Sequence, residues 1–150
     1  MEKGADINTQ GNQYNNTLYL ASHGGHEKLV QILLEKGADV NIQGGKYGNI
    51  LQAASQGGHE KLVQILLEKR ADVNAQGGKY GNALQAASQG GHEKLVKILL
   101  EKEANVNAHG GFYNNALYAA SQGGHKNLAQ ILLEKGADIN EQGGKYGNTL

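Results

Sequence analysis

Residues 82–102, NALQAASQGGHEKLVKILLEK, contain two short helical patterns separated by a pair of glycines. Asn82 is a favourable N-cap residue, and the small residues and leucine that follow it predict a short first helix. The segment that begins at His92 places its leucines, valine and isoleucine on one broad face, which predicts a second, amphipathic helix. Glu93 in the first turn and Lys102 in the last turn complement the dipole of that second helix.

This pattern repeats along the chain with a period of 33 residues and no insertion. Residues 47–79 and 80–112 differ at only six positions, so these two units are close copies of each other. We expect one domain over 1–150, with complete units at 14–46, 47–79, 80–112 and 113–145 and partial units at 1–13 and 146–150. The period is marked by a histidine column, His26, His59, His92 and His125, and by a tyrosine column, Tyr14, Tyr47, Tyr80, Tyr113 and Tyr146.

The position directly after the second helix is expected to need a left-handed backbone. Gly37 and Gly136 suit it, because glycine adopts a positive φ freely, whereas other residues do so at a cost of about 1 kcal/mol. Arg70 and Glu103 occupy the same position in the other two units and are expected to bear that cost. The stretch that follows, residues 71–81, is rich in Asn, Asp and Gly and predicts a turn or hairpin.

A unit of two short helices and a hairpin cannot bury its apolar faces alone. Stacking equal units buries a continuous core between neighbours, and at least three units are needed for stability. Four complete units therefore predict an all-α repeat solenoid.

The residues at these offsets resemble the ankyrin-repeat family over the whole chain. Residues 65–75, ILLEKRADVNA, are similar to the second helix and hairpin of that family, and Gly58-His59 is similar to its turn between the helices. The resemblance implies an ankyrin stack of helix-turn-helix units joined by hairpin loops. It also implies a scaffold that binds proteins, with no enzymatic activity and no cofactor.

The sequence departs from the family at the start of the first helix, which usually reads Thr-Pro-Leu-His. Residues 49–52 read Asn-Ile-Leu-Gln. Asparagine can cap the helix as threonine does and glutamine can donate and accept as histidine does, but the fixed φ of proline is lost. A tyrosine also replaces the usual hairpin glycine, with Gly48 or Gly81 one place later, so the hairpin geometry is expected to differ. This variant is similar to ankyrin arrays of large fungal proteins, which often follow a nucleotide-binding signalling ATPase.

Composition narrows the class of partner and the location of the protein. Fourteen basic and fourteen acidic side chains give no net charge, so the sequence predicts no nucleic-acid partner. No apolar run approaches the roughly 18 residues that span a bilayer, and the first residues, Met1-Glu2-Lys3-Gly4, lack the basic and apolar regions of a secretory signal. With no cysteine for disulfides either, these absences predict no membrane association and a cytoplasmic location.

The recurring polar motifs predict structural rather than chemical roles. Successive histidines of the column lie about one stacking step apart, too far to share a metal ion, so structural hydrogen bonds are expected for them. Residues 39–44 imitate the start of a calcium loop, but the twelfth position of that frame is Ile50 instead of glutamate, so no metal is predicted. The glycine-rich hairpin lacks the Lys-Ser or Lys-Thr of a phosphate loop. The serine column lies at small-residue helical positions, so no catalytic group is predicted: Ser22, Ser55, Ser88 and Ser121.

The binding surface that the resemblance implies is the concave face made by hairpin tips and first helices. Chain positions that differ between close copies are candidates, because positions that hold the scaffold together are kept. Phe112 is the leading candidate, since it is the only phenylalanine and stands in a column that is otherwise lysine or glutamine. It either anchors a partner or packs on a neighbouring hairpin, and the tyrosines are expected to pack at the junction of hairpin and helix. The predicted protein-binding residues are Lys46, Gly48, Gln56, Lys79, Gly81, Gln89, Phe112, Asn114, Tyr118 and Gln122.

Two alternatives to a scaffold for a foreign protein stay open. Neither end of the sequence carries a polar capping repeat, so we expect a segment of a longer array. Uncapped ends also favour head-to-tail self-association, which would make the chain a self-assembling structural element. In the other alternative, the array is the sensor of a larger signalling ATPase whose chemistry lies elsewhere.

Overall fold

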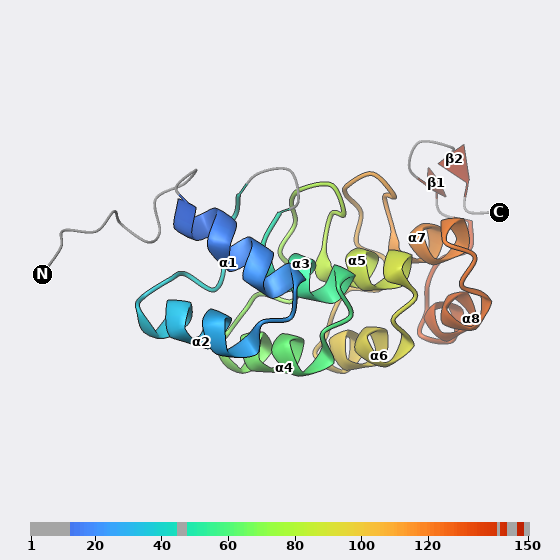
Figure 1. The fold of residues 1–150 in the computed structure, drawn as a ribbon. Coiled ribbons are helices and arrows are strands. Elements are labelled where there is room, and N and C mark those ends of the chain that lie inside the picture. Colours follow the sequence, from blue (N-terminus) through green and yellow to red (C-terminus); the bar gives the residue numbers. More distant parts are fainter. Residues whose placement is uncertain (1–12, 45–47, 141, 144–146, 149–150) are drawn as a thin grey trace, which may run out of the picture.

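The computed structural model describes residues 13–44, 48–140, 142–143 and 147–148, and its helices form four pairs in one stack (Figure 1). Each pair consists of a first helix, a turn and an amphipathic second helix, followed by a hairpin loop. The first helix is the shorter one in every pair except α1 and α2. The helices are α1 (Gln13–His23), α2 (Glu27–Glu35), α3 (Ile50–Gln56), α4 (Glu60–Glu68), α5 (Ala83–Gly90), α6 (Glu93–Glu101), α7 (Ala116–Gln122) and α8 (Lys126–Glu134).

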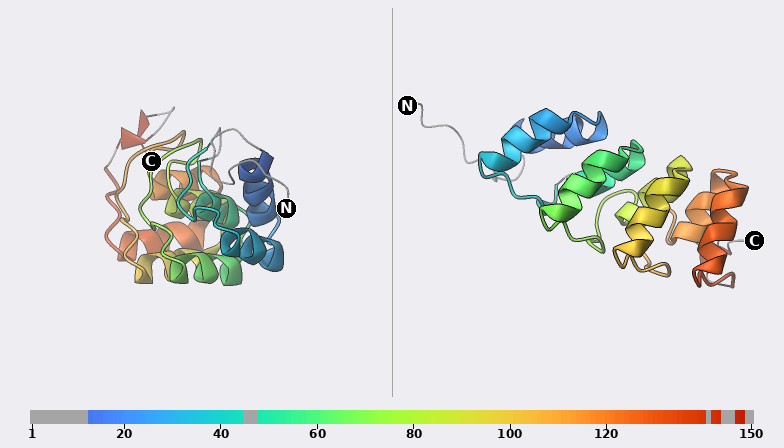
Figure 2. Two further views of the ribbon diagram at one scale, coloured as in Figure 1. Left: turned by 90° about the vertical axis from the view of Figure 1, so that its left-hand side faces the viewer. Right: turned by 90° about the horizontal axis from the view of Figure 1, so that it is seen from below.

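The helices lie in two layers. The first helices α1, α3, α5 and α7 form one layer and pack on one another along the stack, and the second helices α2, α4, α6 and α8 form the other (Figures 1 and 2). The hairpins project beyond the first-helix layer (Figure 1). One hairpin contains a pair of two-residue antiparallel strands, β1 (Gln142–Gly143) and β2 (Gly147–Asn148). The predicted all-α repeat solenoid is confirmed.

The first helices pack closely on one another because alanines line them. Asn82 caps α5 by accepting a hydrogen bond from the Gln85 backbone N–H at 2.8 Å, as its residue type predicted. Ala86 and Ala87 have no exposed surface, so the helix is covered by a neighbour on both sides. Small side chains allow this close approach, and Leu84 fills the remaining space in the core.

The second helices bury one face and leave the other in water. In α6 the buried residues are Leu95, Val96 and Leu99, and Leu99 follows the other two by four and three residues, about one turn, as an amphipathic pattern requires. Glu93 lies in the first turn, as predicted, whereas Lys102 is the C-cap residue and lies just beyond the last turn.

The left-handed position after each second helix is also confirmed. Gly37 and Gly136 have φ of 98° and 97°, and Arg70 and Glu103 have φ of 70° and 69°. The chain therefore follows the same path in all four units, although two of them hold a residue with a Cβ at this point.

Asparagine side chains connect each hairpin base to the next one. Asn41 Nδ2 donates to the Arg70 carbonyl at 3.1 Å, and Asn41 Oδ1 accepts from the Asp72 N–H at 2.7 Å. Asn74 and Asn107 make the same two bonds one and two repeats later. This ladder repeats with the period of the stack and fixes the spacing between units.

Candidate functional site

The hairpin tips that the structure describes in full are held in register with each other. The backbone of each tip closes on itself, since Gly77 N donates to the Gly81 carbonyl at 2.8 Å and Gly110 N donates to the Asn114 carbonyl at 2.9 Å. A further bond joins the two tips, from Phe112 N to the Lys79 carbonyl at 2.8 Å. The two tips therefore form one connected surface beside the first helices.

Glutamines of the first helices tie each tip to the preceding unit. Gln52 Nε2 donates to the Gly81 carbonyl at 2.9 Å and to the Gly77 carbonyl at 3.1 Å. Gln85 Nε2 likewise donates to the Asn114 carbonyl at 3.0 Å. Gln52 also completes a capping box, because its Oε1 accepts from the Asn49 N–H at 3.0 Å. These positioning residues were absent from the predicted binding set, although their capacity to donate and accept was readable from the sequence.

The exposed members of the predicted binding set lie at the tips and at the C-terminal ends of the first helices. Phe112 is 42% exposed, and Lys79 is exposed at the neighbouring tip. Gln122 at the end of α7 is exposed, whereas Gln89 at the end of α5 is half-buried. Asn114, at the same tip as Phe112, is half-buried. These five residues are called the tip face below: Lys79, Gln89, Phe112, Asn114 and Gln122.

Burial limits what other predicted residues can offer to a partner. Tyr118 is only 5% exposed, and Gly48 and Gly81 are buried. Tyr118 lies at the third residue of its helix, the position from which the buried Gln52 reaches toward the next hairpin, so the column points inward. Gln56 is half-buried and its Oε1 accepts from His23 Nε2 at 2.6 Å. Lys46 lies outside the described residues.

Each aromatic contact at the tips joins two neighbouring residues of the same tip. The Phe112 and Tyr113 rings meet edge to face with centres 5.0 Å apart. At the preceding tip the Lys79 ammonium lies 5.6 Å from the centre of the Tyr80 ring, which is 9% exposed. Tyr80 thus packs at the junction of hairpin and helix as predicted, while the Phe112 ring keeps a large exposed area.

Three of the four histidines in the column make the predicted structural hydrogen bond, and no such bond is found for His26 among the described residues. Nε2 of His59, His92 and His125 donates to the carbonyl of His23, Gln56 and Gln89 respectively, at 2.6, 2.9 and 2.9 Å. Each bond connects the start of a second helix to the end of the first helix in the preceding unit. Within the part of the chain that the structure describes, no three His, Asp or Glu side chains converge as a metal site would require.

The polar residues that imitate a calcium loop serve the hairpin base instead. Asp39 Oδ1 accepts from the Asn41 N–H at 2.9 Å, which is a local turn bond, and Asn41 uses both side-chain atoms in the ladder. The hydroxyls of Ser22, Ser55 and Ser88 are fully buried, so a substrate has no access to them in this structure.

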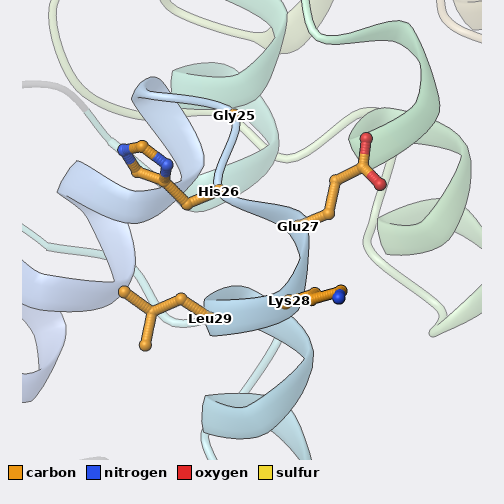
Figure 3. A pocket seen from close by; sticks show the side chains of 5 residues that line it. All are labelled: Gly25, His26, Glu27, Lys28 and Leu29. Carbon is orange, nitrogen blue, oxygen red and sulfur yellow. The ribbon is translucent and has the colours of Figure 1, made fainter.

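A hollow of about 640 Å³ opens at the first described repeat, lined by residues 25–29 (Figure 3). His26 and Leu29 point to one side of the turn, and Glu27 points toward the next repeat, where it meets Lys61 Nζ at 3.4 Å. Leu29 is 41% exposed, whereas its equivalents in the following repeats are fully covered by the unit before them. The hollow is therefore a repeat-stacking surface, and it gathers no set of reactive groups. The covered equivalents are Leu62, Leu95 and Leu128.

No helix in the described ranges is both long enough and apolar enough to cross a bilayer.

Comparison with known protein families agrees with the geometry. A family model described as ankyrin repeats in three copies matches residues 1–77 and, in a second overlapping match, residues 52–143. A search among curated proteins found no match. The two family matches together cover almost the whole sequence and coincide with the stacked helix pairs, hairpins and histidine column. The chain therefore belongs to the ankyrin-repeat family.

Proposed function

We propose that this chain is a non-catalytic scaffold that binds a partner protein through the tip face. Ankyrin repeats are generally protein–protein interaction modules and are typically not enzymes. The observation that carries the choice of surface is Phe112, an aromatic side chain left 42% exposed on a tip whose backbone is fixed from two directions. Aromatic residues, phenylalanine among them, are enriched in protein interfaces, where a few anchor residues carry most of the binding energy.

The second-helix side supports a partner less well. Its exposed residues are mostly charged groups such as Lys61 and Lys94, and solvated rim charges contribute little to affinity. The variation between copies points the same way, because residues 79 and 112 differ while the buried positions of α5 and α3 are nearly the same.

Site-specific cross-linking tests the placement. A photoreactive amino acid is introduced at position 112 or 94 of the full chain, and the products formed in cell extract are compared by mass spectrometry. We expect a discrete partner adduct from position 112 and none from position 94, which lies on α6.

Alanine variants then measure the energy at each position, once a partner has been captured. Phe112→Ala should weaken binding by about 1 kcal/mol or more, and Gln122→Ala by less, while Lys61→Ala and Lys94→Ala leave it unchanged. Equal losses on the two sides of the stack, measured by calorimetric titration, would refute the tip face as the binding surface.

A further inference from the structure

Charge is unevenly distributed between the two sides of the stack. Residues 73–91 and 106–124, which contain the described tips and the helices α5 and α7, hold Lys79 but no aspartate or glutamate. Residues 40–58 likewise contain no aspartate or glutamate, and their one charged residue is Lys46. The carboxylates of these repeats lie in the second helices or in the residues directly after them. In these three stretches the tip side therefore carries two lysines and no carboxylate, although the whole chain carries no net charge.

Lys79 and Phe112 lie on adjacent tips and are held there together. The bond from Phe112 N to the Lys79 carbonyl, at 2.8 Å, fixes the backbone of one residue against the backbone of the other. Lys79 is exposed, and among the described residues no carboxylate lies within 4.0 Å of its ammonium. Its nearest aromatic contact is the Tyr80 ring, with the ammonium 5.6 Å from the ring centre. A cation with no carboxylate partner among the described residues and an exposed aromatic ring thus occupy one connected surface.

A partner that complements this surface needs both a negative charge and an apolar group. Opposite charges across an interface increase the association rate and exclude partners of the wrong sign. The ring of Phe112 supplies the apolar contact, and the edge-to-face packing on Tyr113 keeps it from turning freely. Nucleic acid fits less well, since phosphate backbones are bound by several basic side chains and the described tips provide one.

We infer that the tip face binds an acidic peptide segment of the partner, in which a carboxylate pairs with Lys79 beside an aromatic or leucine side chain that packs on Phe112. The inference rests on the proposed function and adds the chemistry of the partner to it. If the positive charge of Lys79 is replaced by a negative one, the same surface should select basic peptides.

A selection from a random peptide library, displayed on phage, tests this inference on the full 150-residue chain. We expect enriched peptides to contain Asp or Glu close to an aromatic residue or leucine. The same selection on Lys79→Glu should enrich Lys or Arg in place of the acids. Lys94→Glu changes the same charge on the second-helix side and should enrich the same acidic peptides as the unmodified chain.

Affinities of the enriched peptides, measured by fluorescence anisotropy, provide the quantitative test. Lys79→Glu should weaken acidic peptides about fivefold, with most of the difference lost at high salt. Phe112→Ala should weaken them about tenfold at any salt concentration. Circular dichroism of each variant confirms that the helices are intact.

The outcomes separate this inference from the proposed function. Peptides that lose affinity in Phe112→Ala but contain no excess of acids overturn the acidic class alone. A selection that enriches no peptide, or peptides indifferent to Phe112→Ala, overturns the tip face itself. A uridine oligonucleotide that binds as tightly as the selected peptides overturns the peptide class in favour of a nucleic acid.

Discussion

Arg70 and Glu103 hold a backbone conformation that their side chains disfavour. Their φ values of 70° and 69° lie in the left-handed region, where Gly37 and Gly136 carry out the same turn in the other units. Both side chains are exposed, so no contact in the core compensates for the strain. The stack therefore contains two positions at which a smaller residue fits better than the present one.

We predict that Arg70→Gly and Glu103→Gly each raise the free energy of unfolding by up to about 1 kcal/mol. Urea denaturation followed by circular dichroism measures the change. Lys69→Gly is the matched control, because Lys69 precedes the turn at φ of −82° and glycine should destabilise it. Stabilisation by the control, or loss of stability in both Arg70→Gly and Glu103→Gly, would contradict the explanation.

A second residue-level effect couples the tip to the first helix. A Cβ at Gly48 would overlap Gln52 Oε1, and Gly48 has φ of 91°. The unit that has Asn114 at the equivalent place, with φ of 68°, has Tyr118 instead of glutamine. Glycine occurs with glutamine and asparagine with tyrosine in all four units, so the two positions change together.

We predict that Gly48→Asn and Gln52→Tyr are each destabilising alone and less so together. Gly48→Asn forces the Gln52 side chain out of its capping box, whereas Gln52→Tyr removes the bonds to the next tip. In the double variant the clash is absent, so a double-mutant cycle should give a favourable coupling of about 1 kcal/mol or more. Additive losses would show that the paired change in the sequence has another origin.

At the scale of the elements, the sequence predicted which segments are helical but not how they connect. The N-cap role of Asn82 and the buried stripe of α6 depend on contacts between residues three or four positions apart. Such short spacings are visible in the sequence itself. The contacts from Gln52 and Gln85 to the next hairpin span more than twenty residues, so no local pattern contains them. Tyr118 was placed in the binding set for a related reason, because variation between copies does not distinguish an exposed position from a repacked buried one.

The histidine bonds offer a direct test of how second helices attach to the unit before them. His92 Nε2 donates to the Gln56 carbonyl at 2.9 Å, and His26 has no such acceptor among the described residues. We predict that His92→Ala lowers the free energy of unfolding by about 1 kcal/mol, whereas His26→Ala changes it little. Both rings lie over a glycine of their own turn, and the His92 ring also packs against Gly58 of the preceding unit, so the comparison separates the contacts between units from packing within the turn. Equal losses in thermal or urea denaturation would assign the effect to packing.

At the scale of the whole molecule, each unit is covered only by its neighbours. Leu29 is 41% and Ile32 is 52% exposed on the first described repeat, whereas Leu62 and Leu95 in the inner units have no exposed surface. Stability in such an array is a sum of unit terms and neighbour terms. Units with two neighbours should therefore open least often.

We predict that amide hydrogen exchange is slowest in α5 and α6 and fastest in α1 and α2. Leu95→Ala should cost about 2–5 kcal/mol, because it empties a fully covered site, and Leu29→Ala should cost much less. Exchange measured by mass spectrometry after pepsin digestion resolves the helices. Uniform protection from one end to the other would indicate that the stack unfolds as a single unit.

The hydrogen bonds that join neighbouring tips fix the distance between them, so this surface can select ligands by the spacing of their side chains. Helices packed side by side lie about 8–10 Å apart, and an extended peptide advances about 3.3 Å per residue. A ligand that runs along the stack therefore meets successive tips with every third side chain. Since glutamine and backbone bonds fix the interval, a sequence whose anchors follow any other period can engage one tip but not two.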